Sequence, residues 1–262
     1  MRDIRERIDD IRNDRVNGAS TLTRQALETL QLAAASLPPS PPERYLAALT
    51  EVAQELSRGR SNMHSIIYYM QCFLSEITQG PINNDLPLST VQLVDNLLRR
   101  WEESRSQLIE AGAALIGEGQ TIFTGSYSST IIASLVAARR QGKDFKLLIA
   151  LSRCHDDQPA YGQSMARELA DQAVSGTLIE DTDIAEHLAK ADMVLLGADT
   201  VLADNSVVNG YPSAVLARLA RAYSVPVYIL CEVSKCSGQT AVNLEPGFDL
   251  IPAELITDVI TA

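Results

Sequence analysis

The sequence predicts an α/β protein in which a helical N-terminal region is followed by a Rossmann-like domain built on a parallel sheet. Before about residue 120, apolar residues recur every three or four positions, which is the spacing of amphipathic helices. After that point, short apolar runs alternate with amphipathic stretches, which is the pattern of βα units. We therefore assign residues 1–118 to a helical domain and residues 119–262 to a Rossmann-like ligand-binding domain.

The N-terminal region is expected to form five helices separated by proline and glycine breaks. Before the third helix, Ser40 is the predicted N-cap, with Pro41 as the first helical residue and Glu43 completing a capping box. The dipeptide Gly80–Pro81 is expected to close the fourth helix, and Ser89 to open the fifth as its N-cap. The apolar side of each helix is expected to form a core.

The second half is expected to contain five strands linked by four helices. The strands are placed at residues 121–124, 146–150, 177–180, 193–198 and 225–230, and the helices at residues 128–140, 162–173, 182–189 and 213–223. This half contains no Gly-x-Gly-x-x-Gly, so it carries no dinucleotide-binding fingerprint.

The amino-acid composition excludes several classes of protein and of binding site. A chain of 262 residues with 46% hydrophobic and 21% charged residues can bury a sizeable core. Its net charge of -11 argues against nucleic-acid and anionic-membrane surfaces, which depend on clustered Lys and Arg. There is no apolar run of the roughly 20 residues that a membrane span needs, and the charged N-terminus is unlike a signal peptide, so we expect a cytoplasmic protein. The four cysteines and three histidines are scattered, so we expect no metal site or disulfide framework. We also expect no cofactor.

Ligands of open α/β sheets bind beyond the carboxyl ends of the strands, where the loops after successive strands converge. The first such loop contains Gly125, Ser126, Ser128 and Ser129 and runs directly into a helix. Its hydroxyl and backbone N–H groups suit an anion held at the helix N-terminus. Serines in this position are also common helix caps, so capping alone is the alternative.

Three charged residues after later strands are candidates for the same site. Arg153 and Lys235 each lie just beyond a strand and suit a phosphorylated ligand. Asp199 ends a Gly-Ala-Asp run and places a carboxylate at the end of its strand. The alternatives are a salt bridge between the arginine and Asp156, Asp157 or Asp199, and a structural role for the last of these as the cap of a turn.

Residues 195–213 read Leu-Leu-Gly-Ala-Asp-Thr-Val-Leu-Ala-Asp-Asn-Ser-Val-Val-Asn-Gly-Tyr-Pro-Ser. This stretch resembles the Gly-Ala-Asp and Asn-Lys-Ile-Gly-Thr segments of the superfamily that joins the alpha, beta and delta subunits of translation initiation factor 2B with ribose-1,5-bisphosphate and methylthioribose-1-phosphate isomerases. Further similar segments, in the same order along the chain, are residues 14–20, 122–130, 152–153, 162–169 and 248–257. The resemblance implies that the ligand also contacts Gly18, Ala19, Ser20 and Asn209.

The chain departs from the isomerases of this superfamily at several positions. Ser126 stands where their first-strand loop has a cysteine that works with the Gly-Ala-Asp carboxylate, and a hydroxyl is a far poorer acid or base than a thiol. Gly210 replaces the lysine of Asn-Lys, Cys154 replaces the proline of Arg-Pro, and Asn17 replaces the arginine of Arg-Gly-Ala. Asp199 is kept, although initiation factor 2B subunits commonly lose it.

Three functions stay open. The first is a noncatalytic or regulatory protein that binds a phosphosugar or nucleoside phosphate, with Ser126, Arg153 and Lys235 holding the phosphate and Asp199 the sugar hydroxyls. The second is an aldose–ketose isomerase, acting on a sugar phosphate like ribose 1,5-bisphosphate or methylthioribose 1-phosphate, in which Asp199 moves the proton and Ser126 or Cys154 assists. The third is a subunit that acts chiefly through contacts with other proteins.

The resemblance also implies an assembly. We expect a homodimer or a higher homo-oligomer formed largely by the Rossmann-like half, with exposed residues of the helix at 213–223 as candidates for the interface.

Overall fold

The computed structural model describes residues 2–14, 17–38, 41–59, 63–80, 82, 85–153, 160–240, 243–244 and 246–262. The chain forms two compact units, Met1–Glu103 and Ser104–Ala262. They divide inside one long helix, because Trp101 belongs to the core of the first unit and Leu108 to a core of the second. The sequence placed the domain boundary after residue 118, just beyond the end of this helix.

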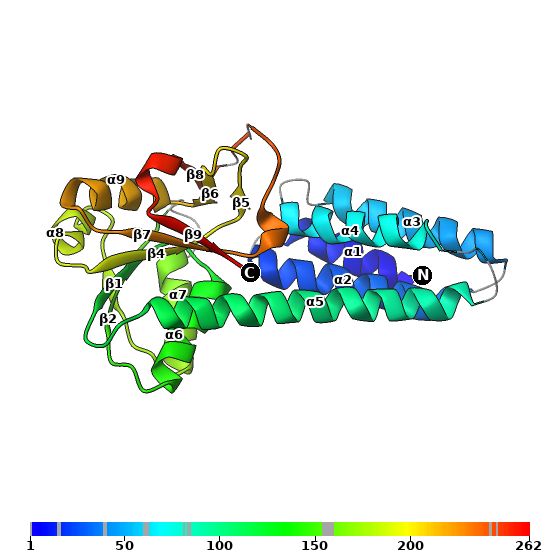
Figure 1. The fold of residues 1–262 in the computed structure, drawn as a ribbon, viewed down its shortest axis with the longest axis horizontal. Helices are drawn as coiled ribbons and strands as arrows, with labels where there is room; N and C mark the ends of the chain where they lie inside the picture. Colours follow the sequence, from blue (N-terminus) through cyan, green and yellow to red (C-terminus); the bar gives the residue numbers. More distant parts are fainter. Residues whose placement is uncertain are drawn as a thin grey trace. The chain divides into compact units, whose positions relative to one another are not determined.

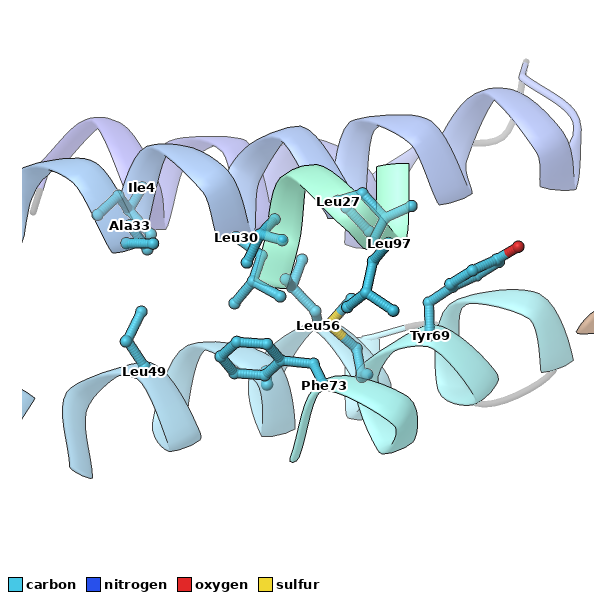
Figure 2. Packing of buried hydrophobic residues seen from close by; sticks show 14 of the residues in the cluster. Ile4, Leu27, Leu30, Ala33, Leu49, Leu56, Tyr69, Phe73 and Leu97 are labelled. Carbon is cyan, nitrogen blue, oxygen red and sulfur yellow. The ribbon is translucent and has the colours of Figure 1, made fainter. Parts of the chain in front are cut away.

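The first unit is helical, as predicted. Its helices are α1 (Arg2–Asn13), α2 (Ala19–Ser36), α3 (Pro42–Gly59), α4 (His64–Ile77) and the first part of α5 (Leu86–Leu115). They lie side by side, and α2 contacts α1, α3 and α4 (Figure 1). Their apolar sides meet in one core, in which Leu27 and Leu30 of α2 face Phe73 of α4 and Leu97 of α5 (Figure 2).

Two helix starts differ from the prediction. Helix α5 begins at Leu86, ahead of the predicted N-cap Ser89, whose Oγ instead donates a hydrogen bond to the Leu86 carbonyl oxygen at 3.0 Å. Leu86 is only 3% exposed, so the core contact of its side chain favours the additional helical turn. Helix α3 begins at Pro42 rather than Pro41, and the predicted N-cap Ser40 lies outside the described residues.

The second unit is built on a parallel sheet of six strands in the order β3-β2-β1-β4-β7-β9. The strands are β1 (Thr121–Thr124), β2 (Lys146–Ala150), β3 (Thr177–Ile179), β4 (Met193–Gly197), β7 (Val227–Cys231) and β9 (Asp258–Thr261). Numbered among themselves, they follow the order 3-2-1-4-5-6 of doubly wound folds. The predicted fold class is confirmed. Of the six strands of this sheet, only the edge strand β9, which has no fully buried residue, was not predicted.

Helices cover both faces of this sheet. They are α6 (Ser129–Arg140), α7 (Tyr161–Asp171), α8 (Ile184–Leu188) and α9 (Ser213–Tyr223), all of them predicted. Ile132 of α6 and Met165 of α7 join one core, which also contains the end of α5, whereas Ile184 of α8 and Leu216 of α9 join another on the opposite face (Figure 1). Among the described residues, we find no helix with the length and apolar character needed to cross a membrane.

A second, antiparallel sheet was not predicted. Its strands, in the order β5-β6-β8, are β5 (Thr200–Val201), β6 (Val207–Gly210) and β8 (Phe248–Ile251). Strands of two to four residues are too short to show a periodic pattern in the sequence. The pairing of Thr200 with Val208 brings Asn209 and Gly210 close to the Gly-Ala-Asp segment that ends at Asp199.

Candidate functional site

The order of the parallel sheet reverses between β1 and β4, since the chain moves outward through β2 and β3 on one side and through β7 and β9 on the other. Folds of this kind bind ligands in the crevice beyond the carboxyl ends of the strands at this point. The loops after β1 and β4 flank it and carry residues 125–128 and 198–199. These two loops form the base of the candidate site.

The loop after β1 is held in an unusual conformation. Ser126 is 5% exposed and has a φ of 63°, in the left-handed region. Its backbone N–H donates a hydrogen bond to the Ser152 Oγ at 2.8 Å, and that hydroxyl donates to the Ala150 carbonyl oxygen at 3.1 Å. The loop packs on α9, because a Cβ added at Gly125 would lie 2.6 Å from Leu216 Cδ1. The loops after β1 and β2 therefore support each other.

Gly210 of β6 and Ser126 share one small volume. A Cβ added at Gly210 would lie 2.1 Å from the Ser126 Oγ and 3.2 Å from the Ser126 Cβ. Real Cβ atoms do not approach other atoms as closely as the first distance, so any side chain at position 210 must displace the hydroxyl. Ser126 and Gly210, which the sequence analysis singled out separately, are thus close neighbours in the structure.

The serines that open α6 have different surroundings. The Ser128 Oγ accepts a hydrogen bond from the Ile131 N–H at 3.4 Å and so caps the helix. A Cβ added at Gly197, at the end of β4, would lie 2.4 Å from this oxygen. Ser129 lines a groove of about 470 Å³ between α5, α6 and α7.

The loop after β2 is fixed by Asp181. The carboxylate oxygens of Asp181 accept hydrogen bonds from the backbone N–H groups of Ser152 at 2.8 Å and Arg153 at 2.9 Å. The Arg153 side chain is exposed and makes no ion pair with any described carboxylate. Asp156 and Asp157, two of the salt-bridge partners considered for it, lie outside the described residues, as does Cys154.

The loop after β4 brings a carboxylate and a buried cation together. Asp199 is half-buried, and its backbone N–H donates to the Val208 carbonyl oxygen at 2.9 Å. Lys235 is 6% exposed, and its Nζ donates to the Ala198 carbonyl oxygen at 3.0 Å. The ammonium group thus lies against the peptide unit that precedes Asp199.

The side-chain amide of Asn209 is hydrogen-bonded to the start of α9. The Asn209 Nδ2 donates to the Ser213 Oγ at 2.8 Å, and this hydroxyl donates to the Gly210 carbonyl oxygen at 2.6 Å. Asp249, opposite Asn209 in the neighbouring strand β8, accepts the Ala214 N–H at 3.0 Å. These contacts fix the start of α9, and the sequence analysis missed the role of Asp249 because its partner lies 35 positions away.

The remaining predicted ligand residues belong to the first unit. Gly18 is the N-cap of α2, and Ala19 and Ser20 are its first residues, 5% and 4% exposed. Their contact with a ligand stays a prediction.

The sequence analysis treated the cysteines as scattered and did not predict that two of them lie near the site. Cys231 ends β7, and Cys236 follows the short 3-10 helix η1 (Val233–Lys235). A hydrogen bond from the Cys231 thiol lowers the pKa of Cys236 to about 7. No group of three or more metal-ligating side chains is found in the described part of the chain.

Comparisons with known proteins identify a family to which the sequence is similar. The sequence model of the initiation factor 2 subunit family matches residues 15–245. The chain is 26% identical over 229 residues to a putative translation initiation factor eIF-2B subunit 2-like protein of Pyrococcus furiosus, covering 87% of this chain and 77% of that protein. It is 28% identical over 233 residues to a ribose 1,5-bisphosphate isomerase of Haloferax volcanii, covering 89% of this chain and 71% of that enzyme.

The fold is found in a solved structure as well. The translation initiation factor eIF-2B of Pyrococcus horikoshii OT3 superposes with a TM-score of 0.83 at 24% identity, covering 99% of this chain and 95% of that one.

Proposed function

Because this chain belongs to the initiation factor 2 subunit family, which includes relatives of both initiation factor 2B subunits and sugar-phosphate isomerases, we propose that it binds a phosphosugar or a nucleoside phosphate at the carboxyl edge of its parallel sheet. In this proposal the chain is related to the regulatory subunits and lacks the usual cysteine-dependent isomerase chemistry.

The observation that carries the proposal is the buried ammonium group of Lys235. A buried cation is normally paired with an anion, since burial without a partner is costly. The hydrogen bond recorded for Lys235 is to a neutral carbonyl oxygen, and no described carboxylate lies within ion-pair distance. A phosphate beyond the end of β4 would supply the missing negative charge.

The other candidate residues are given supporting roles in this proposal. Ser126 and Arg153 assist Lys235 in holding the phosphate, and Asp199 accepts hydrogen bonds from sugar hydroxyls. Asn209 completes this group from the adjacent strand β6. The Gly125, Ser128 and Ser129 segment is proposed to contribute N–H and hydroxyl donors.

The proposal is tested by calorimetric titration of the full chain with ribose 1,5-bisphosphate, methylthioribose 1-phosphate and nucleoside monophosphates. Lys235→Met should weaken binding by about 1.5–3 kcal/mol, or roughly 10- to 150-fold, because a hydrogen bond to a charged group is lost. Lys190→Met is the matched control, since Lys190 is an exposed lysine paired with Glu186. Binding of none of these compounds, or equal binding by folded Lys235→Met protein, would refute the proposal.

A second candidate function is aldose–ketose isomerisation, favoured by the carboxylate of Asp199 at the end of β4. Isomerisation of a sugar phosphate moves a proton between adjacent carbons, which needs an acid–base group. Asp199 would move that proton, with Ser126 or Cys154 assisting. Conversion of ribose 1,5-bisphosphate, followed by nuclear magnetic resonance, separates this function from binding alone.

We also propose a cytoplasmic homodimer or higher homo-oligomer that binds other proteins through the surfaces left free. Tyr223, an exposed aromatic at the end of α9, is a candidate for the dimer interface. Light scattering at micromolar concentration tests the assembly, and a mass of 28.5 kDa would show a monomer and refute it.

A further inference from the structure

A groove of about 470 Å³ lies along α6, between α5 and α7. The described residues that line it fall between Arg105 and Gln172, so the groove belongs to the second unit alone. Small molecules usually occupy pockets of about 300–1,000 Å³. Of the residues assigned to the phosphate site above, only Ser129 lines this groove, so it is a second and separate candidate site.

The floor of the groove is apolar. It is formed by four side chains of α6 and one of α5, namely Ile132, Ala133, Val136, Ala137 and Ile109. On the other side of α6, Ile131 and Leu135 are completely buried in the core, so this helix is apolar on two sides. A helix that covers a sheet normally presents polar residues to solvent, so a second apolar side indicates a binding surface.

Two carboxylates on the rim of the groove have hydrogen-bond partners within the protein. The Glu168 Oε2 accepts a hydrogen bond from the Tyr127 hydroxyl at 2.7 Å. The Glu110 Oε2 accepts one from the Gln141 Nε2 at 2.9 Å. Both carboxylates thereby join the residues that flank α6 to the neighbouring helices α5 and α7.

The arginines of the rim are more available to a ligand. Arg140 donates a hydrogen bond to the Gln172 Oε1 at 3.2 Å. Arg105 is half-buried and forms no hydrogen bond or ion pair with any residue that the structure describes. Its planar guanidinium group matches the shape of a carboxylate. Because Arg105 and Ile109 are four residues apart on α5, they lie on one side of that helix, next to the apolar floor.

We propose that this groove binds an amphipathic carboxylic acid of the fatty-acid class. The carboxylate pairs with the Arg105 guanidinium group, and the hydrocarbon chain passes over Ile109 onto the floor formed by α6. Charge complementarity selects an acid, because Arg105 is the rim charge without a partner in the described part of the chain. The size of the groove favours a small molecule over a protein, since twelve described residues line it, whereas each side of a stable protein interface has roughly 20–30.

Calorimetric titration of the full chain with octanoate, decanoate and dodecanoate, each below the concentration at which it forms micelles, tests the proposal. Affinity should rise by up to about fourfold for each added methylene group, because the floor buries the chain. Dodecyltrimethylammonium has the same chain and a positive charge, and it should bind about tenfold more weakly than dodecanoate, or less. Absence of dodecanoate binding, or equal binding of the two dodecyl compounds, would overturn the proposal.

Replacement of Arg105 tests the charged end of the site. Arg105→Gln should weaken dodecanoate binding by about tenfold or more, because hydrogen bonds between two charged groups are lost. Arg218→Gln is the matched control and should leave the affinity unchanged, since Arg218 is an exposed arginine of α9, which covers the opposite face of the sheet. Equal losses in the two variants would show a general attraction to basic side chains and contradict the assignment to Arg105.

Replacement of Ala133 tests the floor independently. Ala133 is half-buried, so the side chain of Ala133→Glu would occupy the groove and repel a carboxylate, and dodecanoate binding should be lost. Circular dichroism checks that each variant is folded. Unchanged affinity in folded Ala133→Glu protein would overturn the proposal. A lower mass of this variant than of the unaltered chain in light scattering would show instead that the groove is an interface between copies of the chain, and would overturn it as well.

Discussion

Substitution of Gly210 by alanine tests the contact between β6 and the loop after β1. The new Cβ would lie 2.1 Å from the Ser126 Oγ and 3.2 Å from the Ser126 Cβ. Rotation of the hydroxyl relieves the first contact but not the second, so the neighbouring backbone must shift by a few tenths of an ångström. Overpacking of this kind costs about 1–3 kcal/mol. In a chain of this size, each kcal/mol lowers the melting temperature by roughly 2–4 °C.

The matched background is Ser126→Gly, which removes both contacting atoms. Glycine also accepts the left-handed φ of 63° at position 126 without strain. We therefore expect Gly210→Ala to cost much less in Ser126→Gly protein, with a coupling energy of about 1 kcal/mol or more. Thermal and urea unfolding of the four proteins measure this cycle. Equal costs of Gly210→Ala in the two backgrounds would refute the steric reasoning.

Three further predictions concern the loops of the site. Asp181→Ala should destabilise the second unit by about 2–3 kcal/mol in urea unfolding, because two N–H groups of the loop after β2 lose a charged acceptor; an unchanged midpoint would contradict this role. Alkylation of Cys236 by iodoacetamide should accelerate as pH rises through about 7. Cys231→Ala should move the midpoint of this pH dependence up toward the ordinary thiol range, by removing the hydrogen bond that stabilises the thiolate. An unmoved midpoint would show that Cys231 does not lower the pKa of Cys236. Isomerase turnover should be absent or weak, and Ser126→Cys should raise it only through Asp199, so activity that survives Asp199→Asn would exclude this carboxylate as the acid–base group.

The sequence predicted the parallel sheet well because its strands and helices are long enough to show their periods. Five strands of the main sheet and four covering helices lie close to the predicted positions, since residues such as Leu195 and Leu216 are completely buried. The small antiparallel sheet was missed, because its pairing depends on contacts between distant segments, such as Asn209 with Asp249.

The candidate site was only partly accessible to sequence reasoning. The position of Lys235 after a strand was visible, but its hydrogen bond to Ala198 depends on β4 and β7 being neighbours. Ser126 and Gly210, which are in contact, are likewise far apart along the chain. The same is true of Asp181 and Ser152, which are joined by a hydrogen bond. The spacing of residues along the sequence does not predict such contacts.

The mutual support of the loops after β1 and β2 has a consequence for the order of folding. Ser126 and Ser152 both have left-handed backbones, with φ of 63° and 57°, and such residues cost about 1–3 kcal/mol each unless their surroundings hold them. The hydrogen bond that joins them links the loops at the ends of the paired strands β1 and β2, so we expect it to form after these strands have paired. This edge of the sheet should therefore reach its final conformation late, after the centre of the sheet has assembled, and neither loop should keep its conformation when grafted alone into another protein.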